Sequence, residues 1–142
     1  MLESSCSTAL KPSFFNLSLT VIYAIGQAKG YLVAGTGNAS ETYMGYFTKW
    51  GDGGYDFNPI KDLLVEDVFG MLKYLNCPEE IVAKKPSAGL YEGQTDEKEM
   101  GVTYEEIDKF IKTGESEFAE KIKSAHAKTE HKRVPPINYG CN

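Results

Sequence analysis

The chain has 142 residues, of which 42% are hydrophobic and 25% are charged, as is ordinary for one globular domain, and this excludes wholesale disorder. With 15 basic and 20 acidic residues the net charge is −5, so general binding to nucleic acid or to an anionic membrane is not expected. No apolar run is long enough for a membrane-spanning helix. The three dispersed cysteines, Cys6, Cys77 and Cys141, indicate reduced thiols in a cytoplasmic protein.

The N-terminal region allows two interpretations. Apolar and polar residues alternate from Phe15 to Val21, which predicts a strand, whereas Leu19 to Lys29 also fits a helix that ends at Gly30. The short apolar run from Tyr31 to Gly35 predicts a buried strand of an α/β sheet.

Two helices are expected in the middle of the chain. Ser40 is placed to cap a helix from about Glu41 to Phe47. Asp62 is placed to cap a second helix over Leu63 to Leu75, which carries one apolar face.

The C-terminal half begins with Pro78, which is typical of the first turn of a short helix. Residues 84–103 have no periodicity and predict a long mobile loop. Thr103 and Glu106 form a capping-box pattern before a further helix, and residues 115–128 predict a polar helix.

One turn has the composition of an anion site. Gly35-Thr36-Gly37-Asn38 follows an expected strand and precedes a helix, so its amides and the Thr36 hydroxyl could bind phosphate, although a tight turn between strand and helix is the ordinary interpretation. Glu41 either favours the helix dipole or binds Mg²⁺ beside phosphates. His126 and His131 do not match a zinc pattern.

Five segments in series carry a resemblance to a known family. In this order they resemble the C-terminal half of ammonia-dependent NAD⁺ synthetase, from about Tyr23 to Pro136: Gly35–Glu41, Gly45–Gly54, Pro86–Leu90, Gly93–Glu97 and Glu130–Arg133. The resemblance implies a Rossmann-like α/β fold of the adenine nucleotide alpha hydrolase type, with a parallel sheet between helices. Residues 1–142 would form a partial domain that lacks the N-terminal pyrophosphate loop. It also implies a homodimer, or pairing with a complementary N-terminal half.

The resemblance implies an amide ligase that adenylates deamido-NAD⁺ with ATP and then admits ammonia to give NAD⁺. By residue, it assigns ATP contacts to Thr36 and Ser87, and a Mg²⁺ contact to Glu41. It assigns deamido-NAD⁺ contacts to four further residues: Lys49, Asp56, His131 and Lys132.

This chain departs from the family pattern at three cations. Two family arginines fall on Asn16 and Ser18, and a family lysine that contacts ATP falls on Val65. With the pyrophosphate loop also missing, we expect the chain alone to be inactive. The alternative hypothesis is a non-catalytic paralogue that binds nucleotide or pairs with a full-length synthetase.

Overall fold

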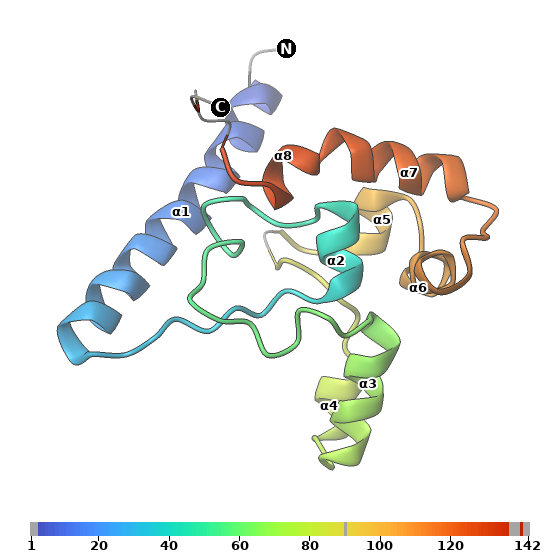
Figure 1. The fold of residues 1–142 in the computed structure, drawn as a ribbon, viewed down its shortest axis with the longest axis horizontal. Helices are drawn as coiled ribbons and strands as arrows, with labels where there is room; N and C mark the ends of the chain where they lie inside the picture. Colours follow the sequence, from blue (N-terminus) through green and yellow to red (C-terminus); the bar gives the residue numbers. More distant parts are fainter. Residues whose placement is uncertain (1–2, 90, 137–139, 141–142) are drawn as a thin grey trace.

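The computed structural model describes residues 3–89, 91–136 and 140, with side chains described from residue 16 onward. Within these residues the regular elements are all helices (Figure 1): α1 (Glu3–Lys29), α2 (Ala39–Met44), α3 (Val65–Tyr74), α4 (Glu79–Val82), α5 (Asp96–Met100), α6 (Tyr104–Thr113), α7 (Ala119–Lys128) and α8 (Glu130–Arg133). Cys77 is a free thiol, whereas the Cys6 side chain and Cys141 lie outside the described residues.

The helical interpretation of the N-terminal region is confirmed, and the strand from Phe15 to Val21 is wrong. Helix α1 runs through this segment and ends before Gly30, which has a left-handed φ of 68°. The polar residues that suggested alternation fit the helix, because the Thr20 hydroxyl donates to the Asn16 carbonyl one turn earlier, at 2.9 Å.

The expected strand from Tyr31 to Gly35 is reduced to an isolated parallel bridge between Ala34 and Phe57. The amide of Gly35 donates to the Phe57 carbonyl at 2.7 Å, but no further strand flanks the pair among the described residues. Tyr31 therefore stays exposed, and the expected parallel sheet is present only as this single contact between extended segments.

Helices α2 and α3 form near their predicted positions but begin at other residues. Asn38, not Ser40, caps α2, and Ser40 is fully buried. Helix α3 begins after Leu64 rather than after Asp62, and the Asp67 carboxylate accepts the Leu64 amide at 3.0 Å.

The predictions for the C-terminal half hold in part. The Thr103 side chain caps α6 by accepting the Glu106 amide, as expected, whereas Pro78 is the N-cap of α4 and not part of its first turn. The segment 84–103 is not a featureless loop, because it contains α5, which Thr95 caps. The polar helix α7 begins at Ala119, later than expected.

The core lies where α6 packs against α2 and α3, and where α7 packs against α2. Its buried members come from all four helices and the segment before α6: Met44, Val65, Val102, Tyr104, Ile107, Phe110 and Ile122. This packing fixes α2, whose first turn carries Glu41, against the rest of the molecule.

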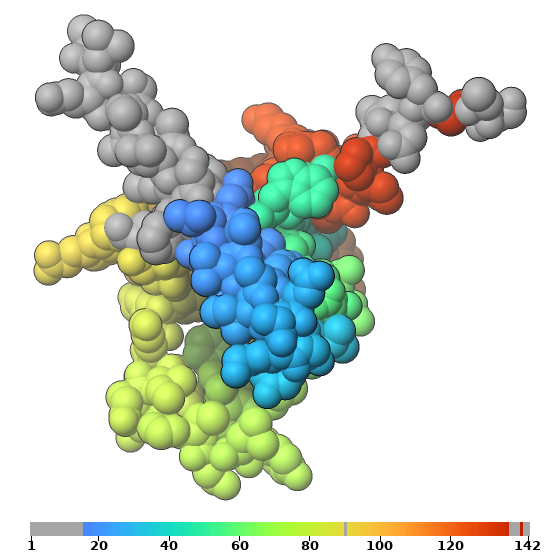
Figure 2. All heavy atoms as spheres, turned by 90° about the vertical axis from the view of Figure 1, so that its left-hand side faces the viewer, coloured from blue at the N-terminus to red at the C-terminus, as the bar shows by residue number. Residues whose placement is uncertain are grey.

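Helix α1 lies apart from this core, along the side of the molecule that faces the viewer in Figure 2. It contacts the loop around residue 54 through Leu19, and the Tyr23 hydroxyl donates to the Asp56 carboxylate at 3.4 Å. Within the described residues no helix is both long and apolar enough to span a membrane.

Candidate functional site

The turn that leads from the bridge into α2 forms one side of the site. Asn38 and Glu41 form a capping box, in which each side chain accepts the other's amide at 2.9 Å. The Ala39 amide donates to the Leu63 carbonyl at 2.8 Å. Several amides that the sequence suggested for an anion are therefore already bonded within the protein, and Gly37 is the part of the turn that lines the adjacent pocket.

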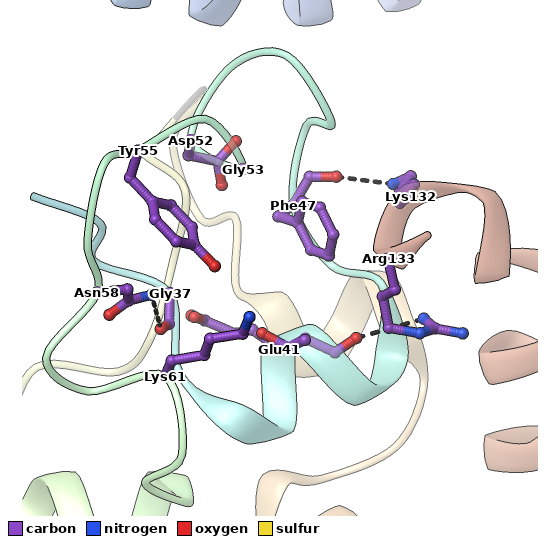
Figure 3. A pocket seen from close by; sticks show the side chains of 11 residues that line it. Gly37, Glu41, Phe47, Asp52, Gly53, Tyr55, Asn58, Lys61, Lys132 and Arg133 are labelled. Carbon is purple, nitrogen blue, oxygen red and sulfur yellow. Dashed lines mark hydrogen bonds between the residues drawn. The ribbon is translucent and has the colours of Figure 1, made fainter. Parts of the chain in front are cut away.

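A pocket of about 450 Å³ opens between this turn, the loop after α2 and helix α8 (Figure 3). It combines two carboxylates and three cations with a tyrosine, an amide and a phenylalanine ring: Glu41, Asp52, Lys61, Lys132, Arg133, Tyr55, Asn58 and Phe47. Such a mixture suits a ligand that carries both polar charged groups and a flat apolar ring.

Glu41 is the carboxylate at the base of the pocket. Burial raises its pKa above the ordinary value, the Asn38 amide acts in the opposite direction, and the charges of Asp96 and Asp52 raise it further. A cation bound beside Glu41 would relieve this unfavourable charge.

The donor chemistry of this corner fits Mg²⁺, which takes one or two carboxylates and completes its shell with water and phosphate oxygens. Glu41 and Asp52 line the same pocket and supply such carboxylates. A site made from protein ligands alone is not indicated, since no group of three His, Cys, Asp or Glu side chains suited to a metal occurs among the described residues.

Side chains of α7, of α8 and of the residue between them bind carbonyl groups at the C-terminal end of α2 and in the loop that follows it. We call this set the C-terminal clamp: His126, Thr129, Lys132 and Arg133. The Lys132 ammonium donates to the carbonyls of Gly45 at 2.8 Å and Phe47 at 2.7 Å. Arg133 donates to the Thr42 carbonyl at 3.3 Å.

The other two clamp residues complete the contact with α2. Nδ1 of His126 lies 2.9 Å from the Tyr43 carbonyl, which requires the proton on that nitrogen, and the imidazole stacks on the Tyr43 ring at 4.1 Å. The Thr129 hydroxyl lies 3.3 Å from the Met44 carbonyl. The last carbonyls of a helix lack partners within the helix, so the clamp both satisfies them and fixes one wall of the pocket.

Of the residues predicted for the site, Glu41 and Lys132 line this pocket, and the others do not. Asp56 accepts the Val33 amide at 2.7 Å, which supports the bridge. The Lys49 ammonium donates to the His131 carbonyl, which holds the loop after α2 against α8. The same ammonium lies 5.3 Å from the centre of the Trp50 ring.

The two predicted ATP contacts are not among the residues that line the pocket. Thr36 is exposed next to Gly37, and the Ser87 hydroxyl accepts the Gly89 amide at 3.1 Å. Val65, the position on which we expected a family lysine to fall, belongs to the core.

Sequence reasoning missed a buried network behind Glu41. Asp108 of α6 is 2% exposed, accepts the Ser40 hydroxyl, and accepts the Glu66 amide at 3.0 Å. Ser40 also accepts the Val65 amide at 3.2 Å. These bonds join the start of α2 to the start of α3, and so fix the residue that precedes Glu41.

A second missed network holds the segment before α6. Asp96 is 3% exposed and accepts the Tyr104 hydroxyl at 3.1 Å and the Ala88 amide at 3.2 Å. The Tyr46 hydroxyl donates to Glu99 at 2.6 Å. Burial, together with these carboxylates, raises the pKa of both tyrosines well above the ordinary value. Because Asp96 bonds both to the Ala88 amide and to the core residue Tyr104, residues 86–88 are held close to the core.

The model of the NAD synthase family matches residues 17–136. The chain belongs to this family. It is 49% identical over 124 residues to the NH₃-dependent NAD⁺ synthetase of Carboxydothermus hydrogenoformans, which covers 85% of this chain and 51% of that protein. It is 47% identical over 135 residues to the synthetase of Archaeoglobus fulgidus, covering 90% and 53%.

Solved structures agree with this membership. The NMN synthetase from Francisella tularensis superposes with a TM-score of 0.88 at 44% identity, covering 93% of this chain and 56% of that one. The NH₃-dependent NAD synthetase from Campylobacter jejuni superposes with a TM-score of 0.70 at 26% identity. The predicted family is confirmed, and the chain spans about half the length of the relatives it matches.

Proposed function

We propose that the chain contributes the C-terminal half of an ATP-dependent amide ligase that converts deamido-NAD⁺ to NAD⁺ with ammonia. Family membership and a pocket that contains two carboxylates and three cations support this activity. In the first step a carboxylate oxygen of deamido-NAD⁺ attacks the α-phosphorus of ATP, and pyrophosphate leaves. Ammonia then attacks the acyl carbon, AMP leaves, and the nitrogen loses a proton.

The site residues have distinct proposed tasks. Glu41 would hold Mg²⁺, which offsets charge on the phosphates as the first step proceeds. Among the described residues Lys132 uses two of its three donors on backbone carbonyls, and we assign the third to the substrate carboxylate. The pKa of Lys132 is lowered, mainly because burial disfavours the charged ammonium; the nearby charge of Asp52 raises this pKa, and that of Arg133 lowers it.

The remaining predicted contacts are proposed to act outside this pocket. Thr36 and Ser87 would contact ATP, while Lys49, Asp56 and His131 would contact deamido-NAD⁺. None of these five residues lines the pocket, so their proposed contacts would involve parts of the ligands that extend beyond it.

The proposed fold requires a second segment or chain, because the described residues contain only one bridge of the expected sheet. We place the chain in the cytoplasm, in a homodimer or paired with an N-terminal half, and we propose a Rossmann-like sheet that the partner segment completes. The parallel bridge between Ala34 and Phe57 supports such a sheet, and an exposed apolar face of α1 supports the partner: Leu17, Val21, Ile22 and Ile25.

The test is NAD⁺ formation from deamido-NAD⁺, ATP and ammonium. The chain alone should give no turnover, whereas adding the N-terminal half of the Carboxydothermus hydrogenoformans synthetase should restore it. Glu41→Ala should abolish the restored activity. Absence of NAD⁺ in the complemented mixture would refute the proposal, and turnover by the chain alone would refute its need for a partner.

A second substrate is supported by one comparison. The structure with a TM-score of 0.88 is named an NMN synthetase, so the mononucleotide acid that corresponds to NMN should be assayed beside deamido-NAD⁺. Faster amidation of the mononucleotide would reassign the substrate.

The non-catalytic alternative rests on Val65, whose place in the core removes a family lysine. Nucleotide binding without turnover in the complemented mixture would favour it.

A further inference from the structure

The three cations that line the pocket differ in how their donors are used. Lys132 and Arg133 are bonded to backbone carbonyls as parts of the C-terminal clamp. Lys61 is exposed and, within the part of the chain that the structure describes, has neither a hydrogen bond nor an ion pair. Figure 3 shows its side chain reaching toward Glu41. Among the described residues, Lys61 is therefore the pocket cation that has no hydrogen bond or ion pair within the protein, so all of its donors can turn to a ligand.

The backbone beneath Lys61 is fixed against the turn before α2. The Asn58 side chain donates to the Gly37 carbonyl at 2.8 Å and accepts the Ile60 amide at 3.1 Å. On the other side, Leu63 accepts the Ala39 amide at 2.8 Å. These bonds hold the base of the lysine in place across the pocket from Glu41, while its four-carbon stem remains free to follow a ligand.

We propose that Lys61 binds an oxyanion of the substrate in this pocket, either a phosphate or a carboxylate group. The identity of the anion rests on the proposed function, but the binding does not. Glu41 and Asp52 would repel an oxyanion, so a positive charge on the opposite wall is needed to hold one. Val65, four residues further along the chain, is in the core and supplies no charge.

Titration calorimetry of the full chain at fixed ionic strength tests this proposal, with inorganic pyrophosphate and nicotinate as separate probes of phosphate and carboxylate. Lys61→Met should weaken at least one probe by about tenfold or more, as expected for one charge-assisted hydrogen bond. Lys61→Arg should restore most of the affinity. Lys73→Met, an exposed lysine of α3 outside the pocket, should bind like the wild type.

Each outcome decides the proposal. Loss of pyrophosphate binding identifies phosphate as the anion, and loss of nicotinate binding identifies the carboxylate. Equal affinities for wild type and Lys61→Met overturn the proposal, as does an equal loss in Lys73→Met or no binding of either probe by the wild type. Binding that depends on Lys61, in a chain that forms no NAD⁺ when complemented, keeps this inference and removes the proposed function.

Discussion

Replacing Lys132 by methionine should destabilise the folded chain, because its ammonium holds the loop after α2. The variant loses two hydrogen bonds, to the carbonyls of Gly45 and Phe47, and keeps most of the aliphatic stem. A hydrogen bond to a charged group contributes about 1.5–3 kcal/mol when buried. Lys132 is half-buried, so screening reduces this roughly by half, and the two bonds together should contribute about 1.5–3 kcal/mol.

Urea unfolding followed by circular dichroism measures this loss, and the midpoint of thermal unfolding should fall by about 5–10 °C. Lys128→Met is the matched control, since Lys128 is exposed on α7 and should change stability by less than about 0.5 kcal/mol. Equal stability of the two variants would refute the clamp. If Lys132 also binds the substrate carboxylate, the variant should lose discrimination between deamido-NAD⁺ and NAD⁺, and unchanged discrimination would leave it a structural residue.

Three further variants test other parts of the site. Because folding raises the pKa of Glu41 above its ordinary value of 4.5, the protonated carboxyl stabilises the folded chain at low pH, and this stability is lost as the pH rises through the folded pKa. Glu41→Gln does not titrate, so it should gain stability relative to the wild type from pH 4.5 toward neutrality. A difference in urea unfolding that does not change with pH would contradict this. Gly45→Ala should lose at least about 2 kcal/mol, because φ is 67° and the new Cβ would lie 2.2 Å from Cβ of Thr129; wild-type stability would argue against that packing. Asp108→Ala should lose about 2–3 kcal/mol by leaving the Ser40 hydroxyl and a helix amide unsatisfied, and a smaller loss than in Asp108→Asn would exclude the network.

Helices could be predicted from sequence where the residues at their own start determine where they begin. Pro78 and Thr103 stand next to the helices that they begin, so α4 and α6 could be placed from sequence. The cap of α2 could also have been found, because Asn38 followed by Glu41 three residues later is a capping-box pattern. Ser40 was predicted as the cap from its residue type alone, but its hydroxyl donates to the Asp108 carboxylate instead.

Contacts between distant segments could not be predicted. The start of α3 is fixed partly by Asp108, 42 residues away from the Glu66 amide that it accepts. The pocket also depends on contacts between distant segments. Glu41 and Lys132 were predicted from the family pattern, whereas Lys61 lines the pocket beside them because the turn at Asn58 folds back onto Gly37.

The exposed face of α1 predicts that the chain associates. Leu17, Val21 and Ile25 recur every four residues, so they form one stripe along the helix, and each is at least half exposed. A contiguous apolar patch of this kind marks an interface, since its exposure to water is unfavourable.

Sedimentation velocity over a wide range of concentration should therefore show a dimer or a larger species. Val21→Lys should shift the chain toward monomer, because a charge in the middle of the stripe would be buried on association. Tyr74→Lys is the control, as Tyr74 is 85% exposed on α3, away from the stripe. A wild-type monomer at every concentration would show that α1 needs no copy of this chain to cover it, and only a complementary half could then occupy the stripe.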